Sequence, residues 1–287
     1  MATFTDFALH TEELDSPALI NALFKANVVE TPTDLVGADG FATLKCGSQS
    51  ALVFIQDSKI YLIKDVPDFR GIKSRDAAQS CFMWSIKNKQ LTVCLGSAGS
   101  GKTFLASAYA AQSILREDKK VVLLKPTKFV GGDSNAIAAV PGGISEKLEP
   151  YTASFEQHME AILGVDHRLF LSEWEEKRKL EFAAVELCRG RHFANSTVIL
   201  DEAQNLTFHE LTSVISRVDD TSKLIILGDP LQIDLENVSW EDTGLFKVLN
   251  SSAWWHAPFA SCVELHTSYR GRLANLANDI ILEQRNA

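Results

Sequence analysis

The chain has 287 residues, of which 46% are hydrophobic and 23% charged, and its formal net charge is −9. This balance is typical of a soluble globular protein, and the acidic charge argues against a surface coated with basic groups for gripping nucleic acid. No apolar run approaches the roughly 18 residues of a membrane span, and the N-terminus lacks the basic start of a signal peptide. Five cysteines without a C-x-x-C pair argue against a disulfide framework, so we expect a cytoplasmic protein without membrane contact.

The first 70 residues are predicted to form a small α+β appendage. Apolar residues at helical spacing predict a helix over residues 16–28. Two apolar runs, 51–56 and 59–64, are joined by Asp57 and Ser58, which predicts a β-hairpin. The turn-forming stretch 67–71 marks the expected boundary, so we divide the chain into residues 1–70 and a domain of residues 71–287.

Beyond residue 75, short and wholly apolar runs alternate with longer helical stretches. The expected strands are Leu91–Leu95, Val121–Leu124, Thr197–Leu200, Leu224–Leu227 and Cys262–Leu265, and the expected helices include Lys102–Leu115 and Leu169–Cys188. Strands that are apolar on both faces suit a parallel sheet covered by helices on each side. The predicted fold class is therefore α/β, and ligands of such a sheet bind at the carboxyl ends of its strands.

A complete G-x-x-x-x-G-K-[ST] motif follows the first of these strands. Its residues are Gly96, Ser97, Ala98, Gly99, Ser100, Gly101, Lys102 and Thr103. The glycines allow backbone N–H groups to surround phosphate oxygens, and the next helix points its positive end at the anion. Lys102 is expected to reach the β- and γ-phosphates, and the Thr103 hydroxyl to ligate Mg²⁺. The motif favours a P-loop NTPase with a RecA-like sheet over a plain glycine turn between a strand and a helix.

Two acidic residues, Asp201 and Glu202, end the third apolar run. Asp201 is expected to hold the Mg²⁺ shell, and Glu202 to orient or deprotonate the attacking water. Without the P-loop, an exposed acidic turn would be an equal alternative. The only Asn-Lys pair precedes the P-loop, so the N-K-x-D element of GTPases is missing and ATP is the expected nucleotide. A small-molecule phosphotransferase is disfavoured because no second acceptor-site motif follows.

Four stretches resemble the PhoH-like ATPase family, and the resemblance covers residues 73–283. They are LGSAGSGKTFLA, PGGISEKLEPY (141–151), RGRHFANSTVILDEAQN (189–205) and GDPLQID (228–234). The core is also similar to the first motor domain of superfamily 1 helicases. The resemblance implies that Gln79 reads adenine, that Gln232 senses the γ-phosphate and that Arg270 faces it. The residues themselves leave alternatives open: a surface helix position for Gln79, a Gly/Asp/Pro turn around Gln232 and a structural ion pair for Arg270.

The sequence departs from the family pattern in two places. Lys125-Pro126 stands where the family has Arg-Pro, which keeps the charge but loses the bidentate fork. A Tyr-Arg pair, Tyr269-Arg270, stands where the family has Val-Arg, and this is closer to the helicase form. Some relatives carry a PIN nuclease domain upstream, but residues 1–70 are too few for one, so no nuclease activity is expected.

The implied partners are a second copy of the chain and a single-stranded nucleic acid. Only residues 271–287 follow Arg270, so no second motor lobe is expected, and a neighbouring subunit would donate an arginine worth about 10³–10⁵ in rate. A homo-oligomeric ring, possibly a hexamer, meets this requirement. Single-stranded RNA or DNA would contact Lys125, Lys128, Lys147, Arg189 and Arg191, although the two arginines have an alternative role in packing the third strand. A slow, nucleotide-gated binding module is the alternative to a motor.

Trp254 and Trp255 are expected to be buried rather than to stack on bases.

Overall fold

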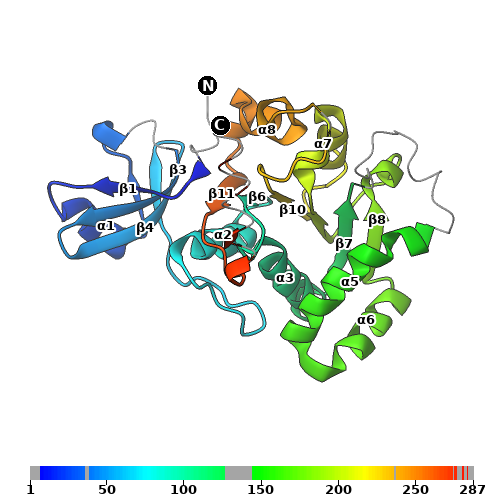
Figure 1. Cartoon of the computed structure of the whole chain (residues 1–287). Helices are drawn as coiled ribbons and strands as arrows, with labels where there is room; N and C mark the ends of the chain where they lie inside the picture. Colours follow the sequence, from blue (N-terminus) through cyan, green and yellow to red (C-terminus); the bar gives the residue numbers. More distant parts are fainter. Residues whose placement is uncertain are drawn as a thin grey trace.

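The computed structural model describes residues 7–35, 39–126, 144–235 and 237–273, together with residues 275, 276, 280 and 283. Within these ranges, Asp34 and residues 144–151 are described by their backbone alone. A small N-terminal sheet lies beside a larger sheet that carries helices on both faces (Figure 1). None of the helices in the described part of the chain combines the length and apolarity needed to cross a bilayer.

The N-terminal region forms a five-stranded sheet with one helix. Its elements are β1 (His10–Glu13), α1 (Ala18–Ala26), β2 (Val28–Glu30), β3 (Gly40–Cys46), β4 (Gln49–Gln56) and β5 (Lys59–Leu62), in the sheet order β1-β3-β4-β5-β2. Helix α1 buries Ile20 and Leu23 against the sheet, which confirms the predicted helix. Strands β4 and β5 pair antiparallel around Asp57 and Ser58, whose φ values of 52° and 58° suit a tight two-residue hairpin turn. The predicted hairpin is therefore confirmed.

The larger region is a six-stranded, wholly parallel sheet in the order β11-β6-β10-β9-β7-β8. Its strands are β6 (Leu91–Gly96), β7 (Lys120–Lys125), β8 (Leu180–Ala184), β9 (Ser196–Leu200), β10 (Lys223–Gly228) and β11 (Ala260–Leu265). Its helices are α2 (Ala77–Asn88), α3 (Lys102–Glu117), α5 (Ile144–Leu163), α6 (His167–Glu176), α7 (Phe208–Ile215), α8 (Gly244–Leu249) and α9 (Ser252–Trp255). All five expected strands are present, and the predicted fold class is confirmed.

Successive side chains of each strand enter two different hydrophobic cores. On β6, Val93 and Leu95 pack in the core that contains α7 and α8, whereas Cys94 packs in the core that contains α2, α3, α5 and α6. Figure 1 shows these two groups of helices on opposite sides of the sheet. The continuous apolar runs of the sequence follow from this arrangement, because both faces of every central strand are covered.

One of the predicted helices is wrong. The stretch Leu169–Cys188 was expected to be a single helix, but α6 ends at Glu176 and β8 begins at Leu180. Strand β8 pairs in parallel with β7, from Leu180 beside Val121 to Ala184 beside Lys125. The run LEFAAVEL contains good helix formers, but pairing at the free edge of β7 outweighs that local preference, as strand formation depends strongly on tertiary context.

Helix α2 connects the two regions through aromatic and polar contacts. The rings of Phe41 and Phe54 pack against Trp84 of α2, with centroid distances of 6.2 and 5.6 Å. Just beyond α2, the Lys89 Nζ donates to Gln56 Oε1 at 2.8 Å and lies 4.4 Å from the centroid of the Phe54 ring. The N-terminal sheet is therefore fixed to the same helix whose first turn lies at the candidate site.

Trp254 and Trp255 pack inside the protein. Trp254 is buried, and the Trp255 ring stacks on Phe7 with a centroid distance of 5.7 Å and an interplanar angle of 5°. This confirms the expectation that the pair serves the core rather than an exposed base-stacking surface. The five cysteines are all free thiols.

Candidate active site

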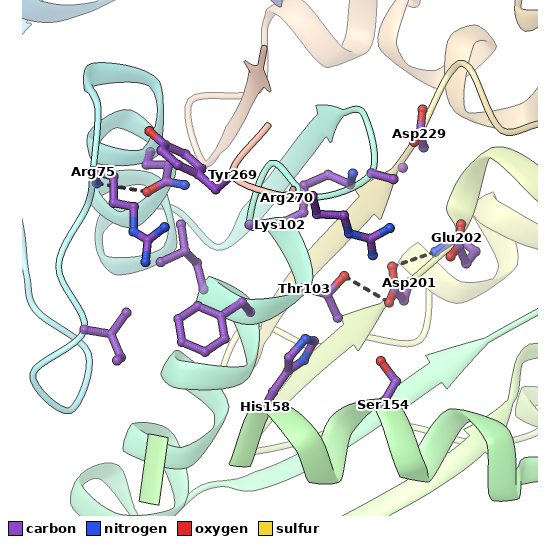
Figure 2. A pocket seen from close by; sticks show the side chains of 18 of the residues that line it. Arg75, Lys102, Thr103, Ser154, His158, Asp201, Glu202, Asp229, Tyr269 and Arg270 are labelled. Carbon is purple, nitrogen blue, oxygen red and sulfur yellow. Dashed lines mark hydrogen bonds between the residues drawn. The ribbon is translucent and has the colours of Figure 1, made fainter. Parts of the chain in front are cut away.

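The topology of the large sheet brings three predicted motifs to one edge. Strand β10 lies between β6 and β9, with Gly228 beside Leu95 and Ile226 beside Leu200. The loops after these three strands therefore leave the sheet next to one another. They line a cavity of about 650 Å³, which also contacts the first turn of α2 and one side of α5 (Figure 2).

The P-loop residues form a tight bend between β6 and α3. None of its three glycines, Gly96, Gly99 and Gly101, has room for a side chain. A Cβ on Gly99 would lie 2.4 Å from Arg270 Cγ, and one on Gly101 would lie 2.9 Å from Gln79 Nε2. All three also have positive φ values, 147°, 84° and 95°, which favour glycine. The motif therefore permits both the bend and the close approach of two other predicted site residues.

Lys102 begins α3 and bends back over this loop. Its Nζ donates to the carbonyl oxygens of Gly96 at 2.5 Å and Ser97 at 3.0 Å. Ser100 is fully buried, and its hydroxyl donates to the same Ser97 carbonyl at 2.9 Å. The ammonium group thus lies at the mouth of the loop, where it can exchange carbonyl oxygens for phosphate oxygens.

Thr103 and Asp201 meet at the floor of the cavity. The Thr103 hydroxyl donates to Asp201 Oδ2 at 3.3 Å, and the backbone N–H of Glu202 donates to Asp201 Oδ1 at 3.0 Å. Burial, together with the neighbouring Glu202, raises the pKa of Asp201. A recessed carboxylate beside a hydroxyl is a donor pair that suits Mg²⁺, because the ion takes oxygen ligands and would offset the unfavourable burial of charge. The described residues contain no group of three or more His, Cys, Asp and Glu side chains for a metal site made of protein alone. Phosphate oxygens and water would have to complete this site.

Glu202 is held from two sides. Its Oε1 lies 3.7 Å from Lys125 Nζ at the end of β7, and its Oε2 accepts from Gln204 Nε2 at 2.7 Å. The residue adopts a left-handed backbone conformation with φ of 56°. A carboxylate with this support faces the cavity in a defined orientation, as the role of positioning a water requires.

Gln204 is a site residue that we did not predict. Its side chain is completely buried, and it joins the loop after β9 to the loop after β10. Besides Glu202, its Nε2 donates to the Gln232 carbonyl at 2.8 Å, and its Oε1 accepts from the Asp229 N–H at 3.0 Å. Asn205 makes a second connection, with two hydrogen bonds of 2.9 and 2.8 Å to Asp234. Both residues stand in the DEAQN stretch, but their long-range partners are visible only in the folded chain.

Gln232 and Arg270 both line the cavity. The Gln232 side chain is exposed to the cavity, whereas its backbone carbonyl is engaged by Gln204. The aliphatic part of Arg270 packs on Gly99, and Figure 2 shows its guanidinium directed toward Thr103 and Asp201. Within the described part of the chain, no acidic group forms an ion pair with Arg270, so the structural ion-pair alternative has no support.

The sequence predicted no role for Tyr269, but in the structure this residue makes several contacts. Its N–H donates to the Gly99 carbonyl at 2.9 Å, and its hydroxyl donates to Asp76 Oδ2 at 2.6 Å. The hydrogen bond to Asp76 is the main reason why the pKa of Tyr269 is raised to about 12. The Arg75 guanidinium lies 5.0 Å from the centre of the tyrosine ring. These contacts connect the segment after β11 to the first turn of α2.

Gln79 is buried, with 3% of its surface exposed, so the alternative of a surface helix position is wrong. Its Nε2 donates to the Ser100 carbonyl at 2.9 Å, and its Oε1 accepts from the Arg75 N–H at 2.9 Å. The side chain thus couples the P-loop to the start of α2 at the end of the cavity that Arg75 and Tyr269 line.

The predicted nucleic-acid contacts are not gathered in one place. Lys125 faces the cavity, and Arg191 pairs with Glu181 at 2.7 Å and lies 5.1 Å from the centre of the Phe193 ring. These contacts support the packing alternative for Arg191. Arg189 is exposed beside a separate cavity of about 260 Å³, between residues 185–188 and α7. Lys128 lies outside the described residues, as do the first three residues of PGGISEKLEPY. The other eight, which include Lys147, are described by their backbone alone.

Helix α5 contributes two residues that the sequence analysis did not identify, Ser154 and His158. Both line the cavity opposite Thr103 and Asp201 (Figure 2). The sequence offered no signal for them because α5 itself was not predicted and both residues lie just beyond the PGGISEKLEPY stretch.

Sequence comparisons identify relatives of this chain. The family described as PhoH-like protein matches residues 71–273. Protein PhoH of Escherichia coli (strain K12) is 32% identical over 177 residues, which cover 61% of this chain and 49% of that protein. Protein PhoH2 of Bacillus subtilis (strain 168) is 31% identical over 254 residues, which cover 84% of this chain and 56% of that protein. The chain thus spans about half the length of the curated relatives it matches.

Solved structures show weaker similarity. Pif1 helicase from Candida albicans matches with a TM-score of 0.37 and 14% identity, over 73% of this chain and 44% of that one. FlhF complexed with GTP and Mg²⁺ matches with a TM-score of 0.22 and 14% identity, over 70% of this chain and 78% of that one. These scores are too low to inform function. The match to residues 71–273, which contains every predicted site residue, shows that the chain belongs to the PhoH-like protein family.

Proposed function

We propose that this protein hydrolyses ATP in a Mg²⁺-dependent reaction at the cavity between the P-loop and the carboxyl ends of β9 and β10. The observation that carries the proposal is the contact of Thr103 Oγ1 with Asp201 Oδ2 beside the P-loop, with Glu202 next in the chain. A phosphate-binding bend, an oxygen donor pair for Mg²⁺ and a cavity-facing carboxylate are the three parts that hydrolysis of a nucleoside triphosphate requires.

In the proposed reaction, Lys102 and the N-terminus of α3 bind the β- and γ-phosphates. Thr103 and Asp201 would hold Mg²⁺, which when bound supplies positive charge to the same phosphate oxygens. Glu202 accepts a hydrogen bond from the attacking water and receives its proton. The water oxygen forms a bond to the γ-phosphorus, and the bond from that phosphorus to the β–γ bridging oxygen breaks. Gln204 keeps the Glu202 carboxylate aimed at the water through the 2.7 Å hydrogen bond to Oε2.

Adenine would bind near the first turn of α2. Tyr269 offers the face of its ring for stacking, and Gln79 lies in the same part of the cavity. Both polar ends of the Gln79 amide already have backbone partners, Ser100 and Arg75. Each partner uses only one of the two N–H donors or one of the two oxygen lone pairs, so Gln79 can read the base through the others. An ATP-over-GTP preference that survives Gln79→Ala would exclude that role.

The proposal extends to a ring oligomer acting on single-stranded RNA or DNA, in a reducing compartment such as the cytoplasm, where free thiols persist. Of the arginines in the described part of the chain, the cavity contacts only Arg75, at its adenine end, and Arg270. A second arginine at the γ-phosphate end would have to come from a neighbouring subunit, in a head-to-tail arrangement that a closed ring satisfies. Sedimentation that shows only monomers in the presence of nucleotide would refute this arrangement.

A slow, nucleotide-gated switch is the second candidate. It is favoured by the hydrogen bond of Lys102 Nζ to a loop carbonyl, which a phosphate could replace, and by the hydrogen bonds of Gln204, which join the γ-phosphate side to the loop after β10. The phosphate-release rate, measured with and without single-stranded RNA, separates the two. A stimulation of tenfold or more supports the motor, and a slow rate that RNA does not change supports the switch.

A further inference from the structure

His158 on α5 faces the part of the cavity where the terminal phosphate of ATP would lie. Its ring is directed toward Thr103 and the Arg270 guanidinium (Figure 2). None of the sequence motifs includes this residue. His158 belongs to α5, whereas the P-loop and the acidic pair follow strands of the large sheet. Its side chain lies against α3, next to the cavity.

Two contacts to α3 fix the orientation of the His158 ring. Its Nδ1 lies 3.3 Å from the hydroxyl of the buried Ser107, and its ring meets Phe104 edge-on, at a centroid distance of 5.7 Å and an angle of 80°. Because Nδ1 is engaged by Ser107, Nε2 is the nitrogen that remains for a ligand, and it has no partner in the described part of the chain.

The charge state of His158 suits a hydrogen-bond donor rather than a cation. Burial and the nearby Arg270 lower the pKa of His158, which favours the neutral imidazole. When the Ser107 hydroxyl donates to Nδ1, the proton of the neutral ring is on Nε2. The ring then offers one N–H to an oxygen in the cavity, beside the positive charge of Arg270.

We propose that His158 donates a hydrogen bond from Nε2 to the terminal phosphate of bound ATP, and that α5 thereby responds to whether that phosphate is present. This inference rests on the proposed ATP site. It assigns α5 a role as the wall that distinguishes the triphosphate from the diphosphate, because ADP has no oxygen at that position. If His158 only packed α5 against α3, its replacement would change the affinities for ATP and ADP by the same factor.

The test compares the affinities of the full chain for Mg²⁺–ADP and for Mg²⁺–AMP-PNP, a non-hydrolysable triphosphate, by calorimetry. His158→Phe keeps an aromatic ring against Phe104 but removes the donor, so AMP-PNP should bind about tenfold or more weakly, the usual effect of losing a hydrogen bond to a charged acceptor. The ADP affinity should stay within about twofold, which also shows that the variant is folded. His158→Gln restores a neutral donor and should recover most of the loss.

Gln157→Ala is the matched control, because Gln157 is the exposed neighbour on the same helix and does not line the cavity. It should change neither affinity. If His158→Phe weakens both nucleotides equally, or neither, the inference is wrong while the ATP site stands. If the unmodified protein binds neither nucleotide, the proposed function itself fails.

Discussion

Replacement of Gln204 by Ala should disturb the orientation of Glu202 without weakening the binding of ATP. The fully buried Gln204 side chain makes three hydrogen bonds, to the Glu202 carboxylate, the Gln232 carbonyl and the Asp229 N–H. The two neutral bonds contribute about 1 kcal/mol each, and the bond to a carboxylate about 1.5–3 kcal/mol, of which water can replace part because Glu202 is partly exposed. We therefore expect the free energy of unfolding to fall by about 3 kcal/mol.

The effect on catalysis should be larger than the effect on substrate binding. Without Gln204, the 3.7 Å contact to Lys125 is the one that remains to the Glu202 carboxylate from the described residues, and the carboxylate can rotate away from the attacking water. A misplaced catalytic group costs on the order of a hundredfold, so kcat should fall by about that factor while KM for ATP changes little. Steady-state phosphate release and urea unfolding measure the two effects on the same preparation.

Asn205→Ala is the matched control, because the Asn205 side chain joins the same two loops through Asp234 and makes no hydrogen bond to the Glu202 carboxylate. The backbone N–H of Asn205, which donates to the Glu202 carbonyl oxygen at 3.1 Å, is kept in this variant. The substitution removes two hydrogen bonds of a nearly buried side chain, so it should lower stability by about 2 kcal/mol but leave kcat within a fewfold of the original. If both variants lower kcat equally, catalysis depends on the connection between the loops after β9 and β10 and not on the orientation of Glu202. If Gln204→Ala leaves kcat unchanged, the positioning argument is refuted.

Four further variants test the catalytic groups, a buried acid and a structural ion pair. Lys102→Ala should abolish nucleotide binding in a fluorescent-nucleotide assay. Glu202→Gln should keep binding but lower phosphate release by at least about a hundredfold, and hydrolysis at the normal rate would remove Glu202 from the mechanism. Burial raises the pKa of Glu264 on β11 to about 8, and its Oε2 has no hydrogen-bond partner. Because the folded state keeps this proton while the unfolded state loses it, stability should fall from about pH 4.5 to pH 8, at up to about 1.4 kcal/mol per pH unit, and then level off. Glu264→Gln should flatten that part of the profile, and an unchanged slope would show that Glu264 is not the titrating group. Arg191→Ala should lower stability by about 1 kcal/mol through its ion pair with Glu181 and leave RNA binding unchanged, and weaker RNA binding would instead assign Arg191 to the nucleic-acid surface.

The failures of the sequence-based predictions have two physical causes. The helix expected at Leu169–Cys188 contains helix-forming residues, but its second half becomes β8 because the edge of β7 is available for pairing. The roles of Gln204, Tyr269 and His158 depend on partners that are distant in the chain, such as Gln232, Asp76 and Ser107. Neither competition between local and tertiary preferences nor side-chain partners at long range can be read from periodicity or spacing.

The parallel α/β sheet, the P-loop at 96–103 and the acidic pair Asp201–Glu202 could be predicted from the amino-acid sequence, because each depends on local order: apolar runs, glycine spacing and the position of acids just after a strand. The surfaces that close the cavity could not, because they come together only when the domain folds. The strand order places β10 between β6 and β9 and so brings the three loops together, and the packing of α5 on α3 brings His158 to the same place. The reason is that strand order and helix packing are set by burial of apolar faces across the whole domain, a property that no single segment of the chain contains.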